Sequence, residues 1–152
     1  MFKSARYIVD YCIANDIGTI VLGYNIGFKK SRRIGKKNTQ NFQYIPYTDL
    51  RNQLTCLCQR YGMTYIEHNE AYTSQSSFLD GDPVPEFCYQ KQGTYDFSGD
   101  RVTRGLYVAS DGTAINADIN AAANILRKTI PDYDEEGLRK GALHSPPIIR
   151  LN

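Results

Sequence analysis

The feature that most constrains the fold is a strand–helix–strand pattern in the first half of the chain. Residues 19–23 read TIVLG, a continuous β-branched and aliphatic run typical of a strand covered on both faces in a parallel sheet. Apolar residues then recur at helical spacing over 47–61, and Gly62 fits the C′ position. Residues 63–70, MTYIEHNE, predict a second strand. Together they form a βαβ unit, expected to be right-handed, so the sequence predicts an α/β fold.

The segments around this unit carry their own signals. Apolar residues at helical spacing over 2–13 predict an opening helix, which ends in turn residues. Prolines and glycines over 76–92 predict an irregular excursion. Residues 95–116 then predict a hairpin, with turn signals at Ser98-Gly99-Asp100 and Asp111-Gly112. A final helix ends before Pro131, and the tail has no periodicity, so we expect it to be loosely docked.

The composition argues against several classes of protein. The chain has 152 residues, 41% of them hydrophobic and 22% charged, which is typical of one soluble domain. No stretch approaches the roughly 18 to 20 apolar residues that a membrane span needs, so we expect no membrane partner and a cytoplasmic protein. The four cysteines are irregularly spaced, which argues against a disulfide framework.

Positive charge is concentrated in one run, KKSRRIGKK. Such a run is either a solvated loop or a phosphate-binding surface. Its candidate nucleic-acid-binding residues are Lys29, Lys30, Arg32, Arg33, Lys36 and Lys37. Arginines and aromatic residues also gather in the predicted hairpin, where they can contact phosphates and stack on bases or, equally, cover the core. This second set is Tyr95, Phe97, Arg101, Arg104 and Tyr107.

The last helical motif, INADINAAANILRK, contains a carboxylate in its first turn. Asp118 has a simple explanation, because an aspartate there caps exposed amides and complements the helix dipole. Alternatively, it lies where an open α/β sheet places its ligands and meets a second carboxylate from a strand end. Two such groups would hold Mg²⁺, which prefers oxygen ligands, for phosphodiester hydrolysis.

Four blocks of the sequence resemble a known family in the same order. INADINAAANILRK resembles the last motif of the RuvC-like nuclease domain of TnpB proteins, which are transposon-encoded RNA-guided DNA endonucleases often described as transposases. The blocks IGTIVLGYNIGFKKS, EAYTSQSSFLDGD and FSGDRVTRGLYVASDGT are similar to earlier parts of one branch. The resemblance implies an incomplete RNase H-like (RuvC-like) fold over 1–131, an insertion and hairpin over 76–115 in place of a zinc ribbon, and a tail over 132–152.

The resemblance also implies catalytic and metal-binding carboxylates. Asp118 matches the third catalytic acid. Many relatives place the second acid at the end of the strand TIVLG, where this chain has Gly23; in the similar branch a glutamate of the next strand, Glu67 or Glu70, takes that role. The two glutamates are three residues apart and face opposite sides of an extended chain, so both cannot reach one metal. Glu70 abuts the motif Ala71-Tyr72-Thr73-Ser74 and is favoured, and Mg²⁺ or Mn²⁺ is the expected cofactor.

The first acid of the family lies in an Asp-x-Gly motif on the first strand. Here only Asp16-Ile17-Gly18 has that spacing, and it falls where a turn is expected. We therefore expect the chain to be the C-terminal part of a longer protein that binds DNA and a guide RNA, and to be inactive alone. The alternatives are a non-catalytic nucleic-acid-binding remnant and an unrelated α/β interaction domain. The missing first strand would leave an open sheet edge at TIVLG, through which two copies could pair.

Zinc is a second departure from the family. Many relatives carry two Cys-x-x-Cys pairs before the last helix, and their four thiolates bind a structural Zn²⁺ ion. The matching positions in this chain are approximately Ser77, Asp80, Val108 and Asp111. None of these is a cysteine, so we expect no zinc.

Overall fold

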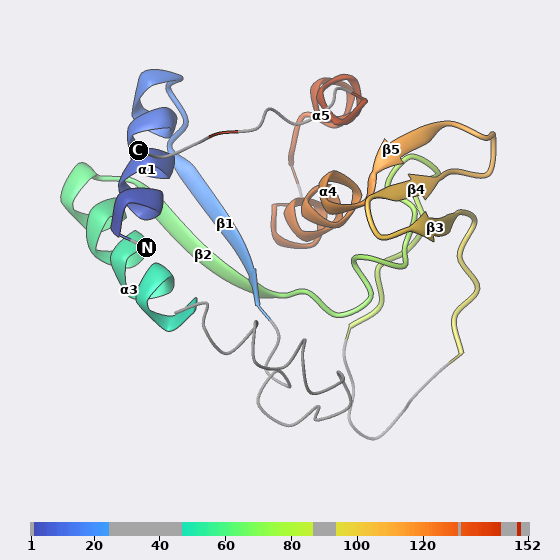
Figure 1. Cartoon of the computed structure of the whole chain (residues 1–152). Helices are drawn as coiled ribbons and strands as arrows, with labels where there is room; N and C mark the ends of the chain where they lie inside the picture. The colour runs from blue at the N-terminus through green and yellow to red at the C-terminus, as the bar shows by residue number, and fades with distance from the viewer. Residues whose placement is uncertain (1, 25–46, 87–93, 131, 144–148, 150–152) are drawn as a thin grey trace. The chain divides into compact units, whose positions relative to one another are not determined.

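The computed structural model of the chain describes residues 2–24, 47–86, 94–130, 132–143 and 149 (Figure 1). The described residues divide into two compact units. The first contains residues 2–22, 47–66 and 149, and the second contains residues 23–24, 67–86, 94–130 and 132–143. Each unit has its own hydrophobic core, so the two are described separately.

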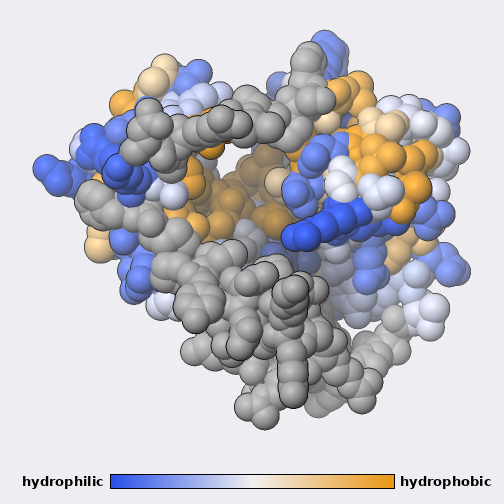
Figure 2. Space-filling view, in the orientation of Figure 1, coloured by the Kyte–Doolittle hydropathy of each residue, from blue (hydrophilic) through white to orange (hydrophobic). Residues whose placement is uncertain are grey.

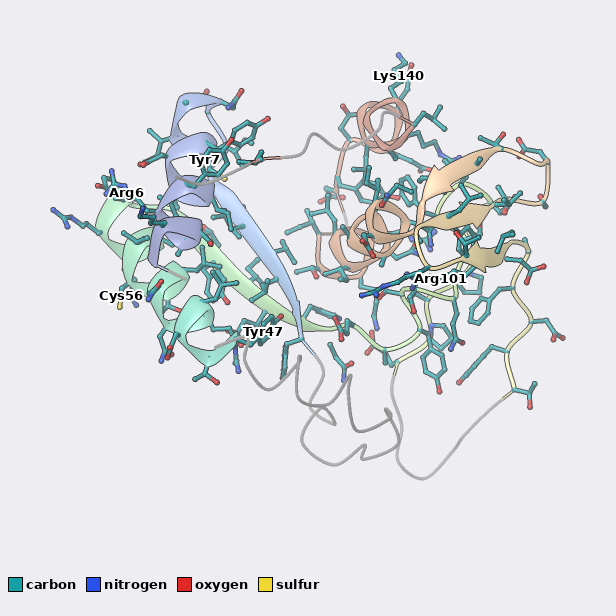
Figure 3. The ribbon with its side chains drawn as sticks, in the orientation of Figure 1. Arg6, Tyr7, Tyr47, Cys56, Arg101 and Lys140 are labelled. Atoms are coloured by element: carbon teal, nitrogen blue, oxygen red, sulfur yellow. The ribbon has the colours of Figure 1, made fainter. Side chains whose placement is uncertain are left out.

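The first unit is built on two helices, α1 (Phe2–Ala14) and α3 (Tyr47–Tyr61), which confirm two of the predicted helices. Their apolar stripes meet in a core of Ala5, Val9, Leu54, Leu57 and Cys58. At the surface, Arg6 donates a hydrogen bond to the hydroxyl of Tyr61 at 2.6 Å and so links the two helices (Figure 3). Cys58 is buried while Cys56 is exposed, as expected for residues two apart on a helix.

Strands β1 (Thr19–Tyr24) and β2 (Thr64–Asn69) are paired neighbours. The amide of Thr64 donates to the carbonyl of Gly18, and six residues later the amide of Glu70 donates to the carbonyl of Tyr24, so the strands run parallel. The predicted α/β character is confirmed, whereas the RNase H-like arrangement stays a prediction. Among the described residues β1 pairs with β2 alone, and dimer formation through its other edge stays a prediction.

The second unit contains a three-stranded antiparallel sheet of β3 (Asp100–Thr103), β4 (Leu106–Val108) and β5 (Ala114–Asn116). Helix α4 (Ala117–Thr129) follows β5 directly. The buried core contains Phe78, Tyr107, Ile115, Ala117, Ala123 and Ala142. Tyr107 from the predicted hairpin is therefore a core residue. Figure 2 shows hydrophobic side chains over this sheet, bordered by strongly hydrophilic ones.

One predicted turn of the hairpin is confirmed and the other is wrong. Gly112 has a positive φ of 85° in the turn between β4 and β5. The segment at Ser98 and Gly99 is a bend that leads into β3, and the β3–β4 turn lies at Arg104-Gly105 instead. Gly99 is needed for close packing, because a Cβ there would lie 2.6 Å from the carbonyl oxygen of Val108.

The expectation of a loosely docked tail is wrong for residues 135–142. These residues form helix α5 (Glu135–Ala142), whose N-cap Asp134 accepts a hydrogen bond from the amide of Gly137 at 2.9 Å. Ala142 is buried in the core of the second unit, and Leu138 packs against that core. With α5 included, no described helix is long and apolar enough to cross a membrane.

Candidate functional site

The carboxylate of Asp118 lies in the first turn of α4 but does not cap the helix. Asn116 is the N-cap, and its side-chain oxygen accepts hydrogen bonds from the amides of Asp118 and Ile119 at 2.9 and 3.1 Å. The Asp118 side chain is 89% exposed, and the guanidinium of Arg101 lies 3.8 Å from its Oδ1. Arg101 reaches from β3 toward α4 (Figure 3). Capping is therefore done by Asn116, and it does not account for Asp118.

Two buried asparagines on α4 bind the loop that contains the YTS motif. Asn120 donates to the carbonyl of Ser76 and accepts from the amide of Phe78, both at 2.9 Å. Asn124 donates to the carbonyls of Thr73 and Ser76, at 2.9 and 2.7 Å. Both side chains are fully buried. Because buried carbonyls need partners, these bonds fix the loop against the helix.

The same loop fixes the backbone of Glu70 after strand β2. The carbonyl of Glu70 accepts hydrogen bonds from the amide of Thr73 at 3.2 Å and from its hydroxyl at 2.8 Å. Asn69 completes the turn by accepting from the amide of Ala71 at 2.9 Å. Partial burial raises the pKa of the Glu70 carboxyl. The position of Glu70 is thus linked to α4 through Thr73 and Asn124.

Gly23 lies directly beside Glu70. A Cβ at Gly23 would lie 3.3 Å from the Cβ of Glu70 and would clash with the end of the Ile125 side chain on α4. A side chain at Gly23 would therefore require the side chain of Ile125 to shift. This packing places Glu70 beside the position where many family members carry their glutamate.

The strand alternation separates the two candidate glutamates. Residues three apart on a strand face opposite sides, so the side chains of Glu67 and Glu70 point away from each other. Glu70 is the glutamate that lies next to Gly23, where the side chain of Ile125 on α4 also reaches.

The relation between Glu70 and Asp118 follows from the geometry of α4. Ile125 follows Asp118 by seven residues, so both lie on nearly the same face of the helix, about 10 Å apart along its axis. The end of the Ile125 side chain lies against the place that a Cβ on Gly23 would take, and the Cβ of Glu70 lies 3.3 Å from that place. Among the described residues, no three histidine, cysteine, aspartate or glutamate side chains gather at one point. Convergence of the two carboxylates on one ion therefore stays a prediction.

An open pocket of about 570 Å³ lies next to this site, and Arg101 forms part of its wall. The rest of the wall comes from residues 74–75, 95–97 and 99–100. The rings of Tyr72 and Tyr95 meet edge to face, with centroids 5.0 Å apart. Arg104 is exposed in the β3–β4 turn, where its carbonyl accepts from Arg101. The predicted aromatic and basic residues therefore divide between this pocket, a turn and the core.

Other predicted residues have different outcomes. The basic run over 29–37 lies outside the described residues, so its phosphate-binding role stays a prediction. Asp16 follows α1 with a positive φ of 56°, which confirms the turn expected there. At the positions matched to zinc ligands, Ser77 donates to Asp80 at 2.5 Å, and the amide of Asp111's neighbour Ser110 donates to Asp80 at 3.1 Å.

This contact network was not predicted from the sequence. Asp80 joins the turn at Ser77 to the strand end at Ser110 by hydrogen bonds. Asp82 is buried and accepts from the amide of Ser77 at 3.0 Å and from the amide and hydroxyl of Ser98 at 2.9 and 2.6 Å. Carboxylates thus join segments that thiolates and zinc would join in many relatives. The expected absence of zinc stays a prediction.

A comparison with known protein families finds a match over the part of the chain that contains the candidate site. The family model of the Cas12f1-like TNB domain matches residues 47–125, which is 79 of the 152 residues. A search among curated proteins gives no significant match. The match includes Glu70, Asp118, the pocket and the two buried asparagines of α4. The chain therefore belongs to the family of the Cas12f1-like TNB domain, a domain of TnpB- and Cas12f-like proteins.

Proposed function

We propose that the chain is part of a TnpB-type RNA-guided DNA endonuclease and that Glu70 and Asp118 are metal ligands of its RuvC-like site. One observation carries this proposal: helix α4 presents the Asp118 carboxylate and also holds the Glu70 segment through the bonds from Asn124 to Thr73 and from Thr73 to Glu70. A shift of α4 would therefore move both carboxylates together. Membership of the TNB-domain family supports nucleic acid as the partner.

The chemistry of the two side chains fits Mg²⁺ or Mn²⁺. Carboxylate oxygens are the ligands that Mg²⁺ prefers, and it commonly uses only one or two of them together with waters. When bound, the ion supplies Lewis-acid activation of the phosphodiester and of the attacking water. Burial raises the pKa of Glu70 because its charge is poorly solvated, so a nearby cation favours the ionised carboxylate.

The neighbouring residues have separate roles in this proposal. Arg101 pairs loosely with Asp118 at 3.8 Å and is available to a substrate phosphate. Among the described residues, no three histidine, cysteine, aspartate or glutamate side chains form a group that could hold a metal ion. Hydrolysis therefore needs a further acid, and we propose that this chain alone binds nucleic acid without cutting it. A non-catalytic binding remnant is the alternative if the pair binds no ion.

Metal binding by matched variants tests the pair. Mn²⁺ affinity is measured by calorimetry for the chain and for Glu70→Gln, Asp118→Asn and Glu67→Gln. We expect the first two variants to weaken binding at least tenfold and Glu67→Gln to leave it unchanged, because Glu67 faces the other side of β2. If only Glu67→Gln lost binding, Glu67 would be the metal ligand and the assignment of Glu70 would be wrong. Equal affinity in all four proteins would reject the site.

A further inference from the structure

We infer that Lys128 is a positioning residue for Glu70. Its buried ammonium holds the carbonyl group of Asn69, the residue before Glu70, and so fixes the direction in which the Glu70 side chain leaves the end of β2. The inference rests on the proposed function, because it concerns a metal ligand of the proposed site. In this role Lys128 acts through the backbone and is not itself a ligand. All three residues belong to the second unit.

Lys128 is the third member of a polar stripe on the buried side of α4. Asn120, Asn124 and Lys128 are spaced four residues apart, so they lie on nearly the same face of the helix. Each of them donates to backbone carbonyls of the segment around and after the end of β2. Asn120 contacts Ser76, Asn124 contacts Thr73 and Ser76, and Lys128 contacts Asn69. The stripe therefore fixes this segment at successive points, and Lys128 holds the point next to Glu70.

The ammonium of Lys128 is surrounded by oxygen atoms. Its Nζ lies 3.4 Å from the carbonyl oxygens of Asn69 and Pro85 and 3.3 Å from Oε1 of Glu86. The Lys128 side chain is 4% exposed, whereas that of Glu86 is 71% exposed. A buried ammonium is costly unless its three N–H donors have partners. Because water screens the exposed carboxylate, the two carbonyls are the partners that hold this charge in place.

The contact at Asn69 acts on the peptide group that precedes Glu70. The carbonyl of Asn69 and the amide of Glu70 belong to one planar unit. Lys128 holds its carbonyl, and the amide donates to the carbonyl of Tyr24 at 3.1 Å. On the other side of Glu70, its own carbonyl accepts from the hydroxyl of Thr73 at 2.8 Å. Both peptide groups that flank the Glu70 Cα are thus held, and together they set the direction of its Cα–Cβ bond.

Amide hydrogen exchange of the whole chain, resolved by residue with NMR, tests the local part of the inference without a metal. Lys128→Met keeps a similar side-chain length but has no donor. We expect the amides of Glu70 and Ala71 to exchange about tenfold faster in this variant, as for the loss of one hydrogen bond. The amide of Phe78, which donates to Asn120, should keep its rate. Asn120→Ala is the local control and should give the reverse pattern.

Thermal unfolding shows whether each variant is folded. Should Lys128→Met not fold, Lys128→Gln is measured in its place. Its amide keeps a donor on a shorter side chain, which we expect to hold at most one of the two carbonyls. The same change in exchange at Glu70 and Ala71 is then expected.

Mn²⁺ affinity, measured by calorimetry, tests the effect on the metal ligand. We expect Lys128→Met to weaken binding about tenfold, as is usual for a residue that orients a ligand. Lys140→Met is the matched charge control, because Lys140 extends outward from α5 and pairs with Glu136 at 2.6 Å (Figure 3). This control should leave the affinity unchanged. In a Glu70→Gln background, Lys128→Met should have no further effect, because it acts through Glu70.

Two results would overturn the inference. One is unchanged exchange of the Glu70 and Ala71 amides in a folded Lys128 variant. The other is a Mn²⁺ affinity that Lys128→Met leaves unchanged, or lowers equally with and without the Glu70 carboxylate, as a purely stabilising lysine would. Failure of the proposed function looks different: Glu70→Gln then leaves Mn²⁺ binding as it is in the unchanged chain. Hydrogen exchange still decides in that case whether Lys128 fixes the backbone at Glu70.

Discussion

Asn124 of α4 donates a hydrogen bond from Nδ2 to the carbonyl oxygen of Thr73 at 2.9 Å. Thr73 in turn donates from its hydroxyl to the carbonyl of Glu70 at 2.8 Å. Two short contacts thus join the helix that carries Asp118 in its first turn to the residue at the end of the parallel strands. The rigidity of this link depends on buried polar groups, which are costly to leave without partners.

Replacing Asn124 with alanine should destabilise the second unit strongly. The change leaves the carbonyls of Thr73 and Ser76 without this donor and removes an acceptor of Arg127. We expect the free energy of unfolding to fall by about 2 kcal/mol or more, measured by urea denaturation. Ala122→Ser, at an exposed position of the same helix, is the control and should change it little. Equal stability of the two variants would contradict the proposed link.

A double-mutant cycle tests the packing at Gly23. Gly23→Ala should cost about 1 to 3 kcal/mol because its Cβ meets the end of the Ile125 side chain. Ile125→Val removes the terminal methyl that lies nearest to the new Cβ. We therefore expect Gly23→Ala to cost clearly less in the Ile125→Val background. Identical costs in both backgrounds, measured by denaturant unfolding, would mean that the steric contact is absent.

The hydrogen bonds at Asp80 predict an acid-dependent stability. Burial alone would raise the pKa of Asp80, but hydrogen bonds from Ser110 and Ser77 outweigh it and lower the pKa, with a contribution from Arg139. A carboxyl with a lowered folded-state pKa stabilises the protein above its ordinary value of about 4, and this stabilisation is lost as the pH falls through the lower folded value. The pKa of Asp111 is lowered as well, chiefly by hydrogen bonds from Thr113, while repulsion from the Asp80 carboxylate acts in the other direction.

Asp80→Asn isolates the contribution of this carboxylate. At pH 7 the variant should be less stable by about 1 kcal/mol, because a neutral amide oxygen is a weaker acceptor. Between pH 5 and pH 2 its stability should fall less steeply than that of the unchanged chain. Urea unfolding at several pH values measures both effects, with Asp111→Asn as the comparison. Parallel pH profiles for Asp80→Asn and the unchanged chain would exclude Asp80 as the source.

Much of the fold follows from periodicity in the sequence. The stripes of α1 and α3 and the apolar run of β1 are long enough to predict their elements. Helix α5 has only eight residues, too few for a stripe to be recognised, although Asp134 and the charges after it form a capping pattern. Its place in the core depends on Ala142 and Leu138 contacting distant residues, which no local pattern reports.

The candidate site was predictable only in part. Asp118 could be selected because a carboxylate in an apolar motif needs an explanation. Asn120 and Asn124 stand four residues apart in the same motif, a spacing that places them on one helix face, and this signal could have identified them as buried anchors. The approach of Arg101 to Asp118 depends on the β3–β4 turn at Arg104-Gly105, which the sequence did not predict.

The basic run over 29–37 gives a separate prediction about binding. Replacing Lys29, Lys30, Arg32 and Arg33 with serine should weaken nucleic-acid binding and reduce its salt dependence, because each lost phosphate contact removes the release of counterions. Sequence preference should change little, since phosphate contacts do not read bases. Anisotropy at several salt concentrations measures the slope. An unchanged affinity and slope would leave the run as a solvated loop.

The last prediction concerns cleavage by this chain alone. Incubation with Mn²⁺ and single-stranded DNA should give no cutting above that of Asp118→Ala. Two carboxylates are too few ligands to hold the two metal ions that this kind of hydrolysis uses. Binding of the strand should persist, since contacts with its phosphates do not depend on a third acid. Cutting that disappears in both Asp118→Ala and Glu70→Gln would refute the prediction. The missing ligand would then be sought at Asp16 or in a second copy of the chain. Mixing the Asp118→Ala and Asp16→Ala proteins distinguishes these sources. Cutting is restored in the mixture only if one site takes ligands from two copies.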